Sequence, residues 1–271
     1  MLNKIKCIFA DEGIDQTGVI SAESFEIINP HLLPAGMRIN SCTVFLVPYK
    51  TKDKNTDSFG VADFARSMDY HAFFHELYLR IIPKLNDAFC GEYFFGFCDH
   101  SPINEKLAAA RAGLGIIGRN SLLINQLYGS YVFIGSLLTT LSLPVTETEI
   151  KPCTDCRICE LNCPADAISV KGIIKEKCLS YISQKKVKTK EEFLLLKSGN
   201  IAWGCDICQN VCPLNKGKKL SGLDYFSICR LNSISEELIA SLSDEQFSKY
   251  AFSWRGKNAL LENLRNLKNG L

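Results

Sequence analysis

The 271-residue sequence predicts a mixed α/β (α+β) amino-terminal domain, a cysteine-rich middle domain and a short helical carboxy-terminal segment. Three observations favour this order. Hydrophobic residues make up 46% of the chain, which is enough for a sizeable buried core. Up to about residue 147, short β-branched runs alternate with apolar residues at helical spacing. Eight of the 13 cysteines then fall between residues 153 and 212. The expected domains are therefore 1–147, 148–220 and 221–271.

The first half of the amino-terminal domain contains two predicted strands and a helix. Residues 42–48 form a short apolar, β-branched run that ends in proline, which is typical of a buried strand. Between residues 63 and 85, apolar side chains recur at helical spacing with charged residues between them, which predicts an amphipathic helix. The aromatic run at 92–98 predicts a second strand.

A turn at residues 99–102 leads into an alanine-rich helix that we expect from Asn104 to Ala112. Gly113 and Gly115 are placed to terminate this helix. Residues 122–124 and 131–137 read as further strands.

Residues 120–146 contain no charged side chain, a length that could cross a bilayer. Asparagine, serine, threonine, glycine and proline residues interrupt this stretch, so we predict buried strands and no membrane span.

Residues 235–267 have apolar side chains in a helical pattern, which predicts the helical carboxy-terminal segment.

The cysteine-rich domain carries a spacing that is specific for iron–sulfur clusters. Cys153-Thr-Asp-Cys156-Arg-Ile-Cys159-Glu-Leu-Asn-Cys163-Pro follows the bacterial ferredoxin run C-x₂-C-x₂-C-x₃-C-P. In that arrangement three closely spaced thiolates bind one cubane [4Fe–4S] cluster, and the fourth points toward a second cluster. The run therefore predicts a second motif downstream.

The second motif is Cys205-Asp-Ile-Cys208-Gln-Asn-Val-Cys212-Pro, with Ala202 where a complete run would have its first cysteine. Cys178 is the only other cysteine between the two motifs, so it is the expected replacement. Cluster one then takes Cys153, Cys156, Cys159 and Cys212. Cluster two takes Cys178, Cys205, Cys208 and Cys163.

Zinc and disulfides are the alternatives for so many cysteines. Zinc sites usually pair two C-x₂₋₄-C knuckles across a longer loop, and three cysteines at the observed spacing would crowd one tetrahedral ion. The odd cysteine count and a start without the apolar core of a signal peptide argue against a secreted disulfide framework. We therefore expect a cytoplasmic protein with two clusters. The five cysteines without metal spacing are expected to act as small hydrophobic residues: Cys7, Cys42, Cys90, Cys98 and Cys229.

The net charge of +2 excludes a strongly basic nucleic-acid binder. The charge is uneven, however. Residues 1–170 carry 14 basic and 19 acidic side chains, whereas residues 171–271 carry 17 and 10. The carboxy-terminal third could face a polyanion, or its basic residues could form an ordinary solvated surface.

Several segments resemble the epoxyqueuosine reductases. Asp99-His-Ser-Pro-Ile-Asn-Glu-Lys followed by Ala-Gly-Leu-Gly-Ile-Ile-Gly-Arg resembles that family's Asp-x-x-Pro-x-x-Glu-Arg/Lys and Ala-Gly-Leu-Gly-x-x-Gly-Lys segments. Residues 129–135 look like the family's next strand. Residues 176–183 and 203–215 match its cluster region, including the single middle cysteine. The similarity extends from about residue 42 to residue 265.

The resemblance implies a cobalamin-dependent reductase related to reductive dehalogenases. A Rossmann-like corrinoid domain would lie beside a double-cluster ferredoxin-like domain. An external donor of the ferredoxin or flavodoxin type would supply electrons through the clusters to cobalt, and epoxyqueuosine in tRNA would be reduced to queuosine. The resemblance makes tRNA a candidate partner, with no membrane involved, and leaves the oligomeric state open.

The family's proton donor is an aspartate that matches Asp99. Epoxide opening leaves an alkoxide that an acid can protonate, and apolar neighbours such as Phe95, Phe97 and Pro102 are expected to raise the pKa of this carboxyl. The alternative role for Asp99 is to cap a turn. His71 and His75 are expected in the core or in the active-site wall. The resemblance implies cofactor contacts at Asp99, Lys106, Asn120, Leu123, Ile134, Ser183 and Asn210.

The chain also departs from the family pattern. His100 stands where the family commonly has serine or threonine, and Lys106 occupies the Arg/Lys position. Family members often continue beyond the equivalent of residues 254–265 into helical repeats that help to bind tRNA, so the resemblance implies a short form. Basic residues could partly compensate through phosphate contacts: Lys185, Lys186, Lys188, Lys190, Lys216, Lys218 and Lys219.

Two functions therefore remain open at this point. The first is an epoxyqueuosine reductase of reduced length, or a paralogue that reduces a related electrophile. The second is a non-catalytic electron carrier or a corrinoid-reactivating partner protein.

Overall fold

The computed structural model describes residues 1–52 and 54–269 and divides into two compact units. Unit 1 comprises residues 1–48, 71–118 and 122–153. Unit 2 comprises residues 49–70, 119–121 and 154–271. These two units differ from the predicted domains 1–147, 148–220 and 221–271. Val61 and Ala65 of the first predicted domain share one core with residues of the 221–271 segment.

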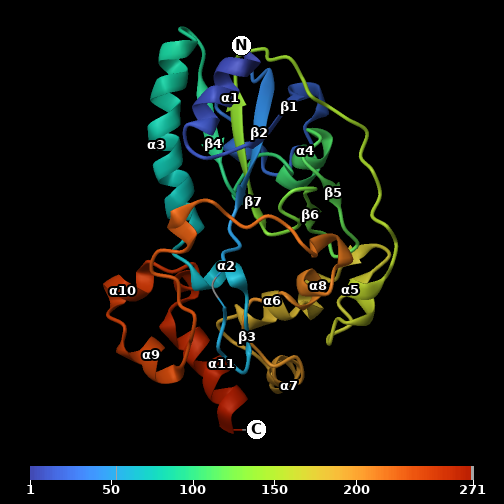
Figure 1. Cartoon of the computed structure of the whole chain (residues 1–271), viewed down its shortest axis with the longest axis vertical. Helices are drawn as coiled ribbons and strands as arrows, with labels where there is room; N and C mark the ends of the chain where they lie inside the picture. The colour runs from blue at the N-terminus through green and yellow to red at the C-terminus, as the bar shows by residue number, and fades with distance from the viewer. Residues whose placement is uncertain (53, 270–271) are drawn as a thin grey trace. The chain divides into compact units, whose positions relative to one another are not determined.

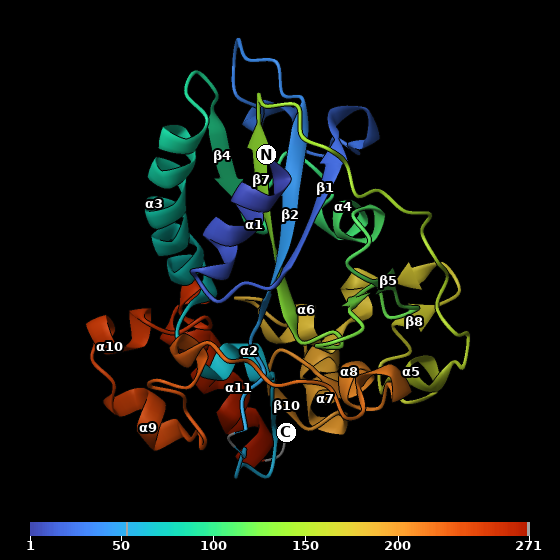
Figure 2. The ribbon, with the colours of Figure 1, turned by 45° about the horizontal axis from the view of Figure 1, so that its top comes forward.

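A four-stranded sheet forms the centre of unit 1, in the order β1-β2-β7-β4 (Figures 1 and 2). The strands are β1 (Gln16–Ser21), β2 (Ser41–Pro48), β7 (Val132–Thr139) and β4 (Phe94–Phe97). All three pairings are antiparallel. The unit therefore has the predicted α+β fold. Its sheet lacks the parallel strand pairs of a Rossmann-like sheet.

Strand β2 is buried along its whole length because both faces of the sheet are covered. Val44 and Leu46 pack with Ala109 of α4 (Glu105–Arg111) on one face. On the other face, Phe45 contacts Phe9 of α1 (Leu2–Ala10) and Phe74 of α3 (Tyr70–Ala88). The continuous apolar run at 42–48 reflects this double burial.

Gly135 on β7 lies opposite Phe45. A Cβ atom at this position would lie 2.3 Å from a ring carbon of Phe45 and 2.5 Å from one of Phe74. The aromatic layer beneath α1 and α3 therefore requires a residue without a side chain at Gly135.

The predicted elements of unit 1 are confirmed with shifted bounds. The strands expected at 42–48, 92–98 and 131–137 are β2, β4 and β7, and the strand at 122–124 is β6 (Leu123–Ile124), which pairs with β5 (Ile116–Ile117). Asn104 caps α4 by accepting the backbone N–H of Leu107 at 3.2 Å. Helix α1 and strand β1 were not predicted, although Ile5, Ile8 and Phe9 of α1 are buried and recur at helical spacing.

The prediction of a single helix over residues 63–85 is wrong, because this segment forms two helices. Helix α2 (Asp63–Arg66) ends where Ser67 adopts an extended conformation, and α3 starts at Tyr70. The hydroxyl of Ser67 donates to the backbone carbonyl of Phe226 at 2.7 Å. This tertiary contact competes with helix continuation, which the apolar spacing alone did not reveal.

Unit 2 is built from short elements. Strand β10 (Ile201–Trp203) pairs in parallel with β3 (Gly60–Val61), and β8 (Ile168–Ser169) forms a hairpin with β9 (Gly172–Ile173). The remaining helices of the unit are α5 (Ile158–Leu161), α6 (Leu179–Ser183), α7 (Lys190–Ser198), α8 (Ile207–Asn210), α9 (Glu236–Ser241), α10 (Asp244–Ser248) and α11 (Lys257–Asn269). Short 3₁₀ turns in the chain are η1 (Ala22–Ser24), η2 (Pro30–Leu32), η3 (Lys175–Lys177), η4 (Pro213–Asn215), η5 (Asp224–Phe226) and η6 (Ser253–Arg255).

The carboxy-terminal segment packs around Trp203, which is fully buried with Phe252 and Leu260. The helical pattern expected over 235–267 is divided among α9, α10 and α11, and Ser235 and Ser243 cap the first two. Within the described residues, no helix has both the length and the apolar character to cross a membrane. This agrees with the strands expected in place of a membrane span at 120–146.

Candidate functional site

Four cysteines of unit 2 lie within electrostatic reach of one another. Burial raises the pKa of the Cys205 thiol to about 12, and the neighbouring thiols of Cys178 and Cys163 raise it as well. Burial likewise raises the pKa of Cys208 to about 12, with Cys205 and Cys178 among its neighbours. Although Cys178 is 27 residues from Cys205 in the sequence, the fold brings together the four thiols expected to hold cluster two.

The thiols expected for cluster one are placed by two short helices. Cys159 lies on α5 and Cys212 lies two residues beyond the end of α8, and these helices pack against each other. Both side chains are buried, whereas Cys156 is exposed. Cys153 is the last residue of unit 1, and its role as a ligand remains a prediction from the spacing.

The loop of the first cysteine motif is held by ion pairs. Arg119 pairs with Asp155, which lies between Cys153 and Cys156, and contacts Glu160 at 3.0 Å. Arg157 contacts the same glutamate at 2.9 Å. Asp155 and Arg157 both have positive φ angles, 54° and 56°, so the loop curls tightly enough for closely spaced thiols to share one centre.

The spacing of the first motif favours clusters over zinc, because three cysteines separated by two residues each would crowd one tetrahedral ion. A tetrahedral zinc site requires four ligands at about 2.3 Å from one ion. In a cubane each thiolate binds a different iron, so its ligands are spread over a larger group.

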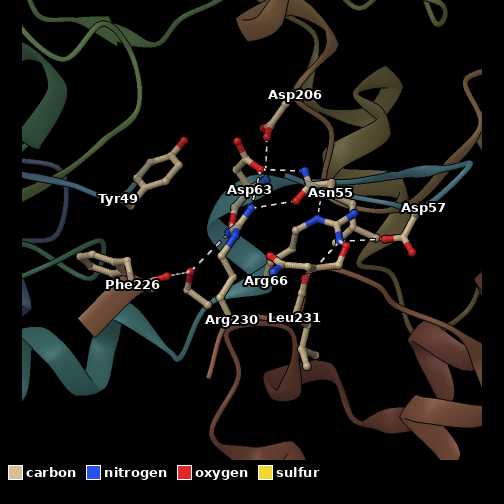
Figure 3. Close-up of polar contacts among 12 residues, drawn as sticks. Tyr49, Asn55, Asp57, Asp63, Arg66, Asp206, Phe226, Arg230 and Leu231 are labelled. Carbon is tan, nitrogen blue, oxygen red and sulfur yellow. Dashed lines mark hydrogen bonds and ion pairs between the residues drawn. The ribbon is translucent and has the colours of Figure 1, made fainter. Parts of the chain in front are cut away.

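A buried polar network connects the second cysteine motif to residues 55–66 (Figure 3). Asp206 lies between Cys205 and Cys208, and it accepts the backbone N–H of Asp63 at 2.7 Å. The Asp63 carboxylate in turn contacts Arg230 at 2.9 Å. Arg66 and Asp57 form a 2.7 Å ion pair, with side chains only 1% and 3% exposed. Burial raises the pKa of Asp206 to about 7.

Unit 1 contains a separate cavity of about 370 Å³ beside the Asp99 segment. Four of the predicted cofactor contacts border it: Asp99, Lys106, Leu123 and Ile134. The lining is mostly aliphatic, with a polar edge formed by Asp99, Asn104, Glu105, Lys106 and Ser130. Partial desolvation lowers the pKa of the Lys106 ammonium, and the nearby Asp99 charge opposes that change.

The carboxyl of Asp99 is more accessible than expected. Its side chain is 59% exposed, so the apolar burial expected from Phe95, Phe97 and Pro102 does not occur at this group. The left-handed backbone of Asp99 (φ 59°) directs the side chain away from that apolar core. His71 and His75 are both exposed, so neither is a core residue as expected. The imidazole of His71 lies 3.6 Å from Asp99 Oδ2.

The buried carboxyl of this region is Glu105, which the sequence analysis did not single out. It is 9% exposed, and burial raises its pKa from 4.5 to about 7, with the Asp99 charge adding to the rise. Its Oε2 accepts the Asp99 backbone N–H at 2.8 Å, and its Oε1 accepts the Ser136 hydroxyl at 2.6 Å. The available signal was its place in the Asp-x-x-Pro-x-x-Glu segment, six residues after Asp99.

The other three predicted cofactor contacts belong to unit 2. Asn120 lies close enough to Cys208 to oppose the rise in the pKa of its thiol, and the hydroxyl of Ser183 accepts the backbone N–H of Gly204 at 2.9 Å. Asn210 lines a smaller cavity of about 160 Å³ with Asp63, Arg66 and Asp206. These three residues therefore surround the second cysteine motif, and their contact with a cofactor remains a prediction.

The fold and the cysteine arrangement define a double-cluster iron–sulfur protein. Residues 152–215 match the family described as "4Fe-4S double cluster binding domain", which contains all eight predicted ligands. Beyond this domain, the chain is homologous to the epoxyqueuosine reductases. That of Shigella dysenteriae serotype 1 (strain Sd197) is 32% identical over 204 residues, 73% of this chain and 54% of the relative. That of Aliivibrio fischeri (strain ATCC 700601 / ES114) is 30% identical over 86% of this chain and 61% of the relative.

The chain thus spans little more than half the length of these curated relatives.

Several solved structures have a fold similar to that of this chain. Epoxyqueuosine reductase from Streptococcus thermophilus matches with a TM-score of 0.83 at 24% identity, over 98% of this chain and 80% of that one. An epoxyqueuosine reductase bound to an epoxyqueuosine-modified tRNA stem loop has a TM-score of 0.81 at 22% identity, over 98% and 79%. A reductive dehalogenase studied for B12-dependent dehalogenation matches at 0.51 and 19% identity, over 97% and 37%.

Proposed function

We propose that this chain is an iron–sulfur, cobalamin-dependent reductase that reduces epoxyqueuosine in tRNA to queuosine, or removes oxygen from a closely related epoxide. The observation that carries the proposal is the joint presence of a double-cluster domain and a cavity bordered by Asp99. Homology to epoxyqueuosine reductases supports the substrate class. The structural likeness to a reductive dehalogenase supports a corrinoid.

The residues present suit both cofactors. Cys163, Cys178, Cys205 and Cys208 supply the thiolates that a [4Fe–4S] cluster requires, and the first motif supplies a second set. The cavity in unit 1 presents aliphatic surface from Leu122, Leu123, Val132 and Ile134 beside a polar edge. Such a lining fits one rim of a large flat macrocycle that carries polar substituents.

Removal of an epoxide oxygen to leave a double bond takes two electrons and two protons and releases water. When bound, the clusters and the corrinoid would supply the electrons. Asp99 would hold one of the protons on its carboxyl and deliver it to the oxygen as the carbon–oxygen bond breaks. His71, 3.6 Å from Asp99 Oδ2, is placed to return a proton to that carboxyl.

The proposal includes tRNA as the macromolecular substrate and an external one-electron donor. The basic bias of residues 171–271 supports phosphate contacts, since each neutralised phosphate releases counterions. Binding of an epoxyqueuosine-modified tRNA stem loop should therefore weaken steeply with salt. A salt-independent affinity would argue against this part of the proposal.

The function is tested with protein purified without oxygen and supplied with cobalamin. We expect about eight irons per chain, bound corrinoid absorbance, and conversion of epoxyqueuosine in tRNA when a chemical reductant is present. A protein that holds both clusters and reduces a separate corrinoid protein, but neither binds cobalamin nor converts the epoxide, would instead be an electron carrier.

Asp99→Ala should retain both clusters and corrinoid binding and lose at least about a hundredfold in kcat, the usual contribution of general acid catalysis. Asp87→Ala is the matched control, because Asp87 is an exposed aspartate of the same unit. If Asp99→Ala turned over as fast as the control, Asp99 would not be the proton donor.

A further inference from the structure

The Asp99 loop, defined as residues 98–102, joins strand β4 to helix α4 and bears the proposed proton donor. Asp99 has a φ of 59°, a left-handed conformation that L-residues other than glycine rarely adopt. Such a conformation persists only where surrounding contacts impose it. The contacts that hold this loop therefore decide where the Asp99 carboxyl lies.

One buried side chain provides the central contact. Glu105 Oε2 accepts the backbone N–H of Asp99 itself at 2.8 Å, and Oε1 accepts the hydroxyl of Ser136 at 2.6 Å. Ser136 lies on β7 in the middle of the sheet and is fully buried. The carboxylate thus connects the left-handed residue of the loop directly to an interior strand of the sheet.

Further contacts attach the loop on either side of Asp99. The Tyr78 hydroxyl donates to the Phe97 carbonyl at 2.6 Å, just before the loop. The Ser101 hydroxyl lies 3.3 Å from that of Ser136. These contacts hold the loop's flanks, whereas Glu105 alone among them contacts the backbone of Asp99.

The burial of Glu105 is itself informative. A carboxylate that is 9% exposed and bound by two uncharged donors has lost most of its hydration, which disfavours its charged form. A fold that needed only a well-packed side chain here would be served better by an apolar residue. The carboxylate is instead placed so that both oxygens act as acceptors.

We propose that Glu105 is a positioning residue that holds the Asp99 loop in the conformation in which the Asp99 carboxyl borders the cavity. This inference rests on the proposed role of Asp99 as proton donor. Glu105 also borders the cavity, but its two oxygens accept the Asp99 N–H and the Ser136 hydroxyl, so its proposed role is exerted through the Asp99 backbone.

Amide hydrogen exchange of the holoprotein, measured without substrate, tests the positioning role directly. In Glu105→Ala the Asp99 amide should exchange about tenfold faster, the factor expected from loss of one hydrogen bond to a charged acceptor. Glu105→Gln should keep protection close to that of the wild type, because its amide oxygen can still accept the Asp99 N–H. Glu76→Ala, at an exposed glutamate of α3, is the matched control.

Kinetics supply the second readout. Glu105→Ala should lower kcat at least about tenfold with KM within about twofold, because the proton donor is misplaced while the binding surface is kept. Glu105→Gln should restore most of kcat. If Glu105→Ala does not fold, Ser136→Ala tests the same connection with a smaller change, and should speed Asp99 exchange about threefold.

The two proposals fail in different ways. Unchanged Asp99 exchange in Glu105→Ala and Ser136→Ala, in a protein that converts epoxyqueuosine, would overturn the positioning role and leave the function intact. Faster Asp99 exchange in a protein whose wild type shows no epoxide reduction would support the positioning role and contradict the proposed function.

Discussion

The two carboxyl groups at the ends of the Asp-x-x-Pro-x-x-Glu segment differ in their access to water. Both border the cavity, but the Asp99 side chain is largely exposed, whereas Glu105 is buried. The segment thus combines a group that can exchange protons with solvent and a group that cannot do so easily. Each is suited to a different task, because proton delivery requires access and positioning requires rigidity.

Burial raises the pKa of Glu105 from 4.5 to about 7. Between these values the folded protein holds a proton that the unfolded chain releases, so the stability from this group is greatest below about pH 4.5 and is lost as pH rises to about 7. Glu105→Gln cannot ionise. Its unfolding free energy relative to the wild type should therefore be higher at pH 8 than at pH 5, by at most about 3 kcal/mol.

Urea unfolding at the two pH values measures this difference. The groups that face Glu105 are Asp99, Tyr78 and Cys42, and they are unchanged in the variant, so their titration contributes equally to both proteins to first order. A relative stability that is the same at pH 5 and pH 8 would show that Glu105 does not change protonation over this range.

At this scale the sequence predicted the grouping of the cysteines around Cys205, but the carboxyls only incompletely. The expectation that Cys7, Cys90 and Cys229 act as small hydrophobic core residues is wrong, because all three are exposed. The spacing of Cys205 and Cys208, with Ala202 in place of a third cysteine, pointed to Cys178, and the structure places these thiols together. Glu105 was missed because its importance lies in a contact with the Asp99 backbone. No residue pattern encodes such a contact.

Among the elements of unit 1, strand β7 carries the tightest packing requirement. A Cβ at Gly135 would overlap the rings of Phe45 and Phe74, which come from β2 and α3. Gly135→Ala should therefore destabilise the protein by about 1–3 kcal/mol, the usual cost of overpacking a core.

The unfolding midpoint in urea checks this expectation. Gly222→Ala is the control, because a Cβ there would meet no atom within 4 Å, and it should change stability by less than about 0.5 kcal/mol. Equal effects of the two substitutions would mean that the aromatic layer adjusts without cost.

The strands and the helix α4 could be predicted because their burial follows a simple period or a continuous apolar run. The break between α2 and α3 could not. Ser67 leaves the helix to bond the carbonyl of Phe226, which lies 159 residues away in the chain. A local pattern of apolar residues contains no information about such a partner, and the same holds for the division of 235–267 into three helices.

For the molecule as a whole, the second cluster depends on one isolated cysteine. Cys178 precedes α6 and lies outside both motifs. Cys178→Ser should reduce the iron and sulfide content of anaerobically prepared protein by about half, because one of two cubanes loses a ligand. Cys229→Ser, at an exposed cysteine without metal spacing, should retain the full content. Full iron content in Cys178→Ser would mean that another residue completes the cluster.

The segment 49–70 is separated from the rest of unit 2 by more than 80 residues, apart from the short insertion 119–121. It nevertheless supplies Val61 and Ala65 to the Trp203 core and Asp63 to the contact with Asp206. A fragment cut to begin near residue 148 would lack these groups, although it would contain all eight predicted cluster ligands. The unit that contains the cysteine motifs is therefore not one continuous stretch of sequence, and we expect such a fragment to fold only if residues 49–70 are supplied with it.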